Sequence, residues 1–195
     1  MAEDLLAERL RRADRARAVI LVEGASDRDA LEALAIRRGR MLADDGVAIV
    51  AIGGSKNIAR ALGVVGVGRR LAGLCDAREE RDYRRGLEGA GFGTVSGRGD
   101  LEAHRFFVCE PDLEGELIGA LGVEAVEGVL ARRGELTAFR TFQRQPTWRG
   151  RPEADQLRRF LGTHSGRKIG AAPALVRALD LHRVPRPLDA VLASV

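Results

Sequence analysis

Residues 18–24 read AVILVEG, a run of five aliphatic residues followed by Glu-Gly. A short, uninterrupted run of aliphatic and β-branched residues is typical of a strand that is buried on both faces of a parallel sheet. The next residues, 26–40, predict a helix that Ser26 can cap, with Asp27 and Asp29 in its favourable first turn. A buried strand followed directly by a helix indicates an α/β fold.

The same pattern of strand and helix occurs three more times along the chain. We predict further strands over residues 46–54, 69–77 and 104–110, and helices after them over residues 55–65, 79–91 and 112–122. Residues 93–103 (GTVSGRGDLEA) have the composition of a loop. Four repeats predict a Rossmann-like α/β domain in which a parallel four-stranded sheet lies between helices.

No further strand is expected after about residue 122. Four helical patterns follow instead, over residues 124–134, 134–145, 153–162 and 168–180, and prolines at 152, 185 and 187 interrupt the last part of the chain. We therefore divide the chain into an N-terminal helix (1–17), an α/β domain (18–121) and a helical, arginine-rich C-terminal extension (122–195).

The composition bounds the class of protein. The chain has 195 residues, of which 45% are hydrophobic and 31% are charged, which is enough to bury a core and excludes general disorder. No apolar run approaches the roughly 18 residues of a membrane span, and the charged residues 1–17 do not resemble a secretory signal. Cys75 and Cys109 are too few for a disulfide framework. We expect a cytoplasmic protein that has no membrane partner.

Charge is unevenly distributed along the chain. Residues 132–186 contain 13 basic and 4 acidic residues, whereas residues 1–131 contain 19 basic and 23 acidic residues. An acidic first part followed by a basic last part indicates a metal or catalytic centre beside a surface that binds a polyanion. An ordinary solvated helical surface would give the same pattern, so charge alone leaves both interpretations open.

Carboxylates follow three of the four predicted strands. The first strand ends at Glu23, the third ends at Asp76, and the fourth is followed by Asp112 and Glu114. Because the carboxyl ends of parallel strands share one edge of the sheet, these side chains should meet there. Clustered carboxylates favour a cation among them, and oxygen ligands suit Mg²⁺ or Mn²⁺. The alternative is that acids near the strand ends, such as Asp27, Glu79 and Glu116, only cap helix N-termini.

Five segments together resemble the Toprim domain of the overcoming-lysogenization-defect (OLD) family of nucleases. The first is LVEGASDRDAL, which is similar to the opening Glu motif of that domain. The others, in chain order, are AIGGSKNIARAL (51–62), LAGLCDARE (71–79), FFVCEPDLEGELIGALG (106–122) and GTHSGRKIGAAPAL (162–175). The resemblance covers about residues 18–180, and the ordered set of five is more specific than the first motif alone.

The resemblance implies a nuclease that cleaves DNA with two Mg²⁺ or Mn²⁺ ions. Glu23 would be a metal ligand or general base, Lys168 would stabilise charge at the phosphate, and the remaining metal ligands would be Asp27, Asp76, Asp112 and Glu114. Backbone or side chains that approach the phosphate would come from Gly53, Gly54, Lys56, Arg78 and Arg167. Lys56 and Lys168 are notable because all 30 other basic residues are arginine.

Two departures from the family pattern keep other functions open. Arg78 stands where the second acid of an Asp-x-Asp motif is expected, and Glu79 or Glu80 are the nearest substitutes. The chain has no phosphate-binding loop of the ATPase type, so we expect no ATP site, a stand-alone form of the domain, and any ATPase on a separate polypeptide. A homodimer is another possible assembly. The alternative functions are a catalytically weakened module that binds nucleic acid or regulates a partner ATPase, and RNA cleavage or primase-like nucleotidyl transfer.

Three minor candidates complete the sequence picture. Cys75 and Cys109 are best interpreted as small buried thiols. Trp148 can stack on a base or pack against the helical extension, and we favour packing. Arginines of the extension offer a surface for the DNA backbone, at positions 140, 144, 149, 151, 158 and 159.

Overall fold

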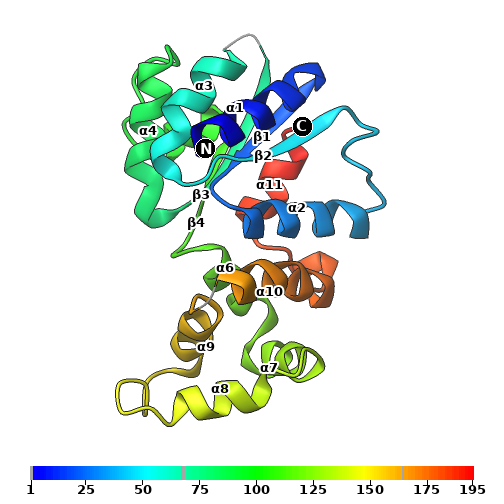
Figure 1. Cartoon of the computed structure of the whole chain (residues 1–195), viewed down its shortest axis with the longest axis vertical. Helices are drawn as coiled ribbons and strands as arrows, with labels where there is room; N and C mark the ends of the chain where they lie inside the picture. Colours follow the sequence, from blue (N-terminus) through cyan, green and yellow to red (C-terminus); the bar gives the residue numbers. More distant parts are fainter. Residues whose placement is uncertain (1, 67–68, 164) are drawn as a thin grey trace.

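A four-stranded, fully parallel sheet forms the centre of the molecule (Figure 1). The computed structural model describes residues 2–66, 69–163 and 165–195. The strand order is β2-β1-β3-β4, with bounds of Val47–Ala51, Ala18–Val22, Arg70–Asp76 and Phe106–Cys109. The predicted α/β class and the parallel four-stranded sheet are confirmed, and the strands are shorter than predicted, at their carboxyl ends and, for β2, β3 and β4, also at their starts.

Strand β1 shows why the run of aliphatic residues decides the fold. All five of its residues are buried. Ile20 and Val22 contact the core on one face of the sheet, and Val19 and Leu21 contact the core on the other. Because successive side chains of a strand point to opposite faces, an apolar residue at every position is what a sheet covered on both sides requires.

Helices cover both faces of the sheet. One face packs against α1 (Ala2–Arg12), α3 (Ile58–Val65), α4 (Glu80–Gly89) and α5 (Arg98–Ala103). The other face packs against α2 (Ala25–Arg37), α6 (Leu113–Leu121) and α11 (Arg186–Ala193), and α10 (Ser165–Ala178) packs on α2 and α6. Short 3-10 turns join several elements: η1 (Ala13–Arg15), η2 (Ser55–Asn57), η3 (Ala77–Glu79) and η4 (Leu181–Arg183).

A smaller group of helices extends beyond the carboxyl edge of the sheet. It consists of α7 (Val123–Arg132), α8 (Leu136–Gln143) and α9 (Glu153–Leu161), seen in the lower part of Figure 1. The chain then returns, and α10 lies along α2. Buried side chains of α9, including Leu157 and Leu161, belong to the same core as those of the sheet. The helical lobe is thus fixed against the edge where the carboxylates were expected.

Three local predictions are wrong. Residues 93–103 contain helix α5 instead of a continuous loop, because Asp100 Oδ2 accepts the N–H of Ser96 over 2.7 Å and Leu101 anchors the turn in the core. Residues 186–193 form α11, which Pro187 opens rather than breaks. Helix α2 begins at Ala25, so Gly24 and not Ser26 holds the N-cap position.

Two further features concern the whole chain. No strand follows β4 within residues 110–163 and 165–195, as the sequence predicted. Among the described residues, none of the helices has both the length and the apolar character needed to cross a membrane.

Candidate metal centre

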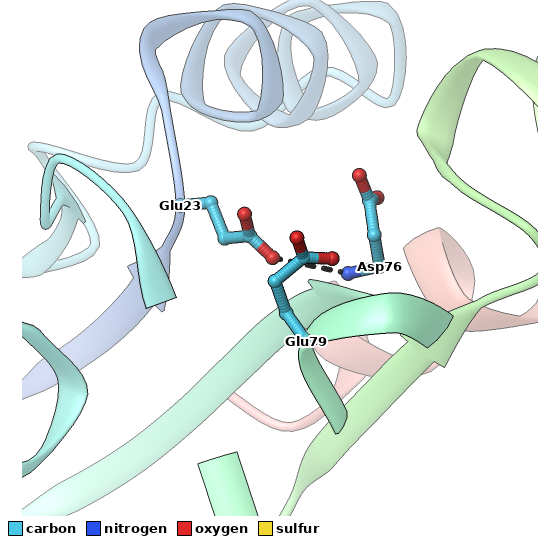
Figure 2. A group of neighbouring side chains, drawn as sticks. All are labelled: Glu23, Asp76 and Glu79. Atoms are coloured by element: carbon cyan, nitrogen blue, oxygen red, sulfur yellow. Dashed lines mark hydrogen bonds between the residues drawn. The ribbon is translucent and has the colours of Figure 1, made fainter. Parts of the chain in front are cut away.

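Three carboxylates meet where β1 and β3 end. Glu23 follows β1, Asp76 is the last residue of β3, and Glu79 ends the 3-10 turn η3. One oxygen atom from each lies within 4.8 Å of the others, and Figure 2 shows the three side chains around a common space. The sheet edge therefore brings three carboxylates close enough together to bind one metal ion.

The position of Glu23 depends on the Gly-Gly turn after β2. The carbonyl oxygen of Glu23 accepts the N–H of Gly53 over 2.9 Å and that of Gly54 over 3.1 Å. Both glycines have positive φ, of 79° and 110°, which residues with a Cβ rarely adopt. The structure thus gives this turn a definite role in holding the main chain of Glu23.

Asp76 links three elements of the sheet edge. Its N–H donates to Glu23 Oε1 over 3.3 Å, and its Oδ1 accepts the N–H of Leu113, at the start of α6, over 3.1 Å. The neighbouring thiol of Cys75 is buried, and burial together with the charges of Glu23 and Asp76 raises its pKa above the ordinary value. Cys109 is likewise buried, so both cysteines are small buried thiols, as expected.

Glu79 completes the group in place of a second acid at position 78. It occupies the N-cap position of α4 but its side chain makes no capping hydrogen bond. Its Oε2 is buried and has no hydrogen-bond partner among the described residues. Burying a carboxylate oxygen without a partner is costly, and a bound cation would remove that cost.

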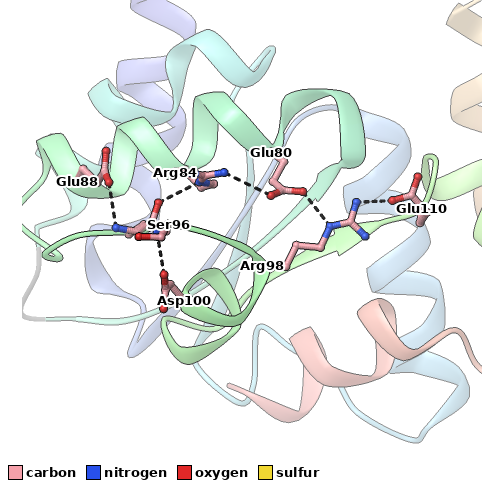
Figure 3. Close-up of polar contacts among 8 residues, drawn as sticks. Glu80, Arg84, Glu88, Ser96, Arg98, Asp100 and Glu110 are labelled. Atoms are coloured by element: carbon pink, nitrogen blue, oxygen red, sulfur yellow. Dashed lines mark hydrogen bonds and ion pairs between the residues drawn. The ribbon is translucent and has the colours of Figure 1, made fainter.

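Glu80, the other candidate substitute, is directed elsewhere. Its Oε2 accepts Nε of Arg98 over 2.8 Å, and Arg98 also pairs with Glu110 (Figure 3). These contacts raise the pKa of Arg98 above its ordinary value, chiefly through the hydrogen bond to Glu80. Because Arg98 comes from α5, the helix that the sequence failed to predict, this separation of Glu79 from Glu80 could not be read in advance.

The donor set fits a small divalent cation. Three carboxylates from three points of the edge supply the oxygen ligands that Mg²⁺ and Mn²⁺ prefer. The buried Glu79 oxygen is the independent observation that favours such an ion over a merely solvated acidic patch.

The other expected ligands do not belong to this three-residue group. Asp27 is buried and its Oδ2 accepts the N–H of Gly24 over 2.8 Å, which is the helix-capping role. Asp112 caps α6, since its Oδ1 accepts the N–H of Gly115 over 2.8 Å, while its Oδ2 accepts Nε of Arg158 over 2.7 Å. Glu114 is also buried. The roles of all three as metal ligands stay predictions.

A cavity of about 450 Å³ connects the acidic edge to the helical lobe. We call it the acid–arginine cavity. Acidic side chains line it on the sheet side and arginines line it mainly from α9 and the segment before it: Asp76, Asp112 and Glu114 on one side, and Arg78, Arg151, Arg158 and Arg159 around them. An anionic group bound by the arginines would therefore lie next to a cation bound by the carboxylates.

Trp148 supports one of these arginines. Its ring stacks on Phe142 with centroids 5.2 Å apart, and the guanidinium of Arg151 lies over the Trp148 ring at 5.2 Å. Trp148 therefore packs within the lobe, as we favoured, and orients Arg151 at the cavity.

The expected basic residues fall into two groups. Lys56 Nζ donates to Asp82 Oδ1 over 2.9 Å, and Ser55 Oγ donates to the other oxygen of Asp82 over 2.8 Å, so Lys56 already has an anionic partner. Arg167 and Lys168 belong to the first turn of α10, but their side chains lie outside the part of the chain that the structure describes, as does His164.

Sequence reasoning did not identify the contact between Asp112 and Arg158. Both residues were named, one as a metal ligand and one as a DNA contact, but they are 46 residues apart and no spacing rule joins them. The only signal was the adjacency of an acidic and a basic half of the chain.

Comparisons with known proteins agree with this architecture. Residues 16–67 match the family model described as overcoming lysogenization defect protein-like, TOPRIM domain. A structure of the C-terminal region of the Xanthomonas campestris pv. campestris OLD protein is similar over 92% of each chain, with 23% identity and a TM-score of 0.69. That of the Burkholderia pseudomallei OLD protein covers 91% of this chain and 96% of its own, with 22% identity and a TM-score of 0.62. A comparison with curated proteins gives no match. The chain therefore contains an OLD-like Toprim segment at residues 16–67, within the fold of the C-terminal region of OLD proteins.

Proposed function

We propose that this protein is a Mg²⁺- or Mn²⁺-dependent nuclease that hydrolyses phosphodiester bonds in DNA. The observation that carries the proposal is the group of Glu23, Asp76 and Glu79, whose ligand atoms lie within 4.8 Å of one another. The match of residues 16–67 to the OLD-like Toprim model supports membership of a nuclease family, whose substrate is nucleic acid.

The three carboxylates would hold the metal ion and fix its place beside the acid–arginine cavity. A divalent ion bound there would polarise a phosphate oxygen and lower the pKa of a bound water. Glu23 would act as a ligand or as the base that takes the proton of the attacking water. Asp27, Asp112 and Glu114 stay proposed contributors, the first by supporting the Glu23 segment.

The basic residues would bind and orient the substrate. Arg78, Arg151 and Arg159 line the cavity and can contact phosphate oxygens there. Gly53, Gly54 and Lys56, and Arg167 and Lys168 at the start of α10, are proposed phosphate contacts, with Lys168 stabilising charge in the transition state. The helical residues 122–195, treated as an extension of the α/β domain 18–121, would track the DNA backbone.

Plasmid nicking tests this function. Purified protein with Mn²⁺ is expected to convert supercoiled plasmid into nicked and linear forms, and Glu23→Gln is expected to abolish the conversion. Nicking by Glu23→Gln at the wild-type rate would sink the assignment of Glu23, and no nicking by wild-type protein would sink the activity.

A second candidate is a Toprim module that binds nucleic acid without cleaving it, or that regulates a separate ATPase polypeptide. Arg78 in the place of an acid, on the wall of the cavity, favours this alternative. DNA binding that persists with no uptake of Mg²⁺ or Mn²⁺ would decide for it. A cleavage assay on an RNA strand under the same conditions tests whether the substrate is RNA instead of DNA. A homodimer is also a proposed assembly.

A further inference from the structure

Arg158 places a permanent positive charge beside Asp112, the residue that caps α6. Its Nε lies 2.7 Å from Asp112 Oδ2, and the Asp112 side chain is only 12% exposed. A guanidinium stays protonated at every pH at which proteins fold. The carboxylate of Asp112 is therefore already neutralised by a side chain from the helical lobe.

Each partner is anchored from one side, and the Arg158 side chain itself is 38% exposed. Arg158 lies on α9 between Leu157 and Leu161, both fully buried in the core. Asp112 is held by its second oxygen, Oδ1, which accepts the N–H of Gly115 over 2.8 Å at the start of α6. A preformed contact of this kind costs little ordering entropy and competes well with a dissolved ion.

The geometry points to a single-ion centre: we propose that the Arg158 guanidinium is the built-in cation for Asp112, so that Asp112 holds no divalent ion and each chain binds one, at Glu23, Asp76 and Glu79. The inference rests on the proposed function and departs from the two ions that the family resemblance implies. A second divalent ion at Asp112 would stand next to the guanidinium, and like charges at that separation repel strongly in a partly buried site.

The same contact gives Arg158 a position in the substrate site. Arg158 lines the acid–arginine cavity together with Asp76, so its charge faces the same space as the proposed ion. An ion held by Glu23, Asp76 and Glu79 on one side and a guanidinium on the other would present two cations to one phosphate group. Arg158 would thus supply the positive charge that a second metal ion supplies in two-metal sites.

Counting bound Mn²⁺ tests the proposal without any activity measurement. Wild-type protein is equilibrated with saturating Mn²⁺, and free and bound ions are distinguished by electron paramagnetic resonance and by dialysis with elemental analysis. We expect one ion per chain for wild type and two for Arg158→Gln, which removes the charge that faces Asp112. Arg158→Lys keeps the charge and should bind one.

Two matched variants localise the effect. Arg159→Gln changes the next residue of the same helix, on the wall of the same cavity, and should keep one ion per chain. The double variant Arg158→Gln, Asp112→Asn should return from two ions to one, because the second site then lacks a ligand.

Each other outcome has a definite meaning. Two ions in the wild-type protein, a count that needs no variant to fold, would overturn the proposal, as would a count of one in folded Arg158→Gln. No ion in the wild-type protein would instead remove the proposed metal-dependent function on which the inference rests.

Discussion

The main-chain N–H of Asp76 donates a hydrogen bond to Glu23 Oε1 over 3.3 Å and so ties the end of β3 to the end of β1 (Figure 2). The two strands are neighbours with a fixed parallel register, in which Val22 lies opposite Leu74. The spacing of the two acids is therefore set by the sheet and not by flexible loops. Glu79, on the 3-10 turn after β3, then needs only its own rotamer to complete the group.

Glu79 and Glu80 make a matched pair for testing which acid belongs to the metal centre. Glu79→Gln should weaken Mn²⁺ binding by about 100-fold or more. Loss of a residue that only hydrogen-bonds to a metal ligand already costs about 10–100-fold in affinity. Glu80→Gln should leave Mn²⁺ affinity within about threefold, because Glu80 pairs with Arg98 instead. Isothermal titration calorimetry measures both, and a larger loss for Glu80→Gln would refute the assignment.

The arginines of the acid–arginine cavity predict a salt-dependent affinity for DNA. Arg151→Ala and Arg159→Ala should each weaken binding across all sequences and lower the slope of log K against log salt concentration by about 1. Fluorescence anisotropy at several salt concentrations gives the slope. Equal slopes for variants and wild type would show that these residues do not contact phosphate.

Asp82 predicts a pH-dependent contribution to stability. Hydrogen bonds from Lys56 and Ser55 lower its pKa below the ordinary value of 3.8 in the folded protein. The stabilisation is therefore present above about pH 4 and is lost as the pH falls through the folded pKa. We expect Asp82→Asn to lower the free energy of unfolding by about 0.5–1 kcal/mol at pH 7.

Urea titrations of both proteins at pH 7 and pH 3 check this pH dependence. The difference between wild type and Asp82→Asn should shrink at pH 3, where other titrating groups affect both proteins alike. An undiminished difference would mean that the charge of Asp82 is not the stabilising feature.

Gly73 predicts a strict size limit inside the sheet. A Cβ at this position would lie 2.2 Å from Cδ1 of Phe106 and 3.2 Å from the carbonyl oxygen of Leu21. Gly73→Ala should therefore cost about 1–3 kcal/mol or more of unfolding free energy. Gly63→Ala, in α3 where a Cβ meets nothing within 4 Å, should instead stabilise by about 0.5–1 kcal/mol.

Thermal and urea denaturation of these two glycine variants measure the contrast. A companion Phe106→Leu change should recover part of the loss in Gly73→Ala. If Gly73→Ala were as stable as wild type, the Phe106 ring would not lie as close to Gly73 as in this structure.

The sequence predicted what depends on local pattern. The buried run 18–22 and the three later strands were recognisable because a sheet covered on both faces needs apolar residues at every position. Glu23 and Asp76 were placed at one edge because parallel strands end together. The fold and two members of the acidic group follow from these periodicities.

The sequence could not predict what depends on turns and distant contacts. Whether Glu79 or Glu80 enters the group is decided by the 3-10 turn η3 and by Arg98, which belongs to a helix with a glycine-rich sequence that resembled a loop. The pairing of Asp112 with Arg158 depends on how α9 packs against α6, which no local spacing encodes. Such tertiary contacts decide whether a given acidic residue is available to a metal ion or caps a helix.

The most direct test of the metal centre is an anomalous-difference map of a crystal soaked in Mn²⁺. The account predicts a strong peak at about 2.0–2.3 Å from carboxylate oxygens of Glu23, Asp76 and Glu79, and its loss in Glu23→Gln crystals soaked in the same way. A map with no peak at these three residues, in crystals where the soak reaches other acidic sites, would contradict the account.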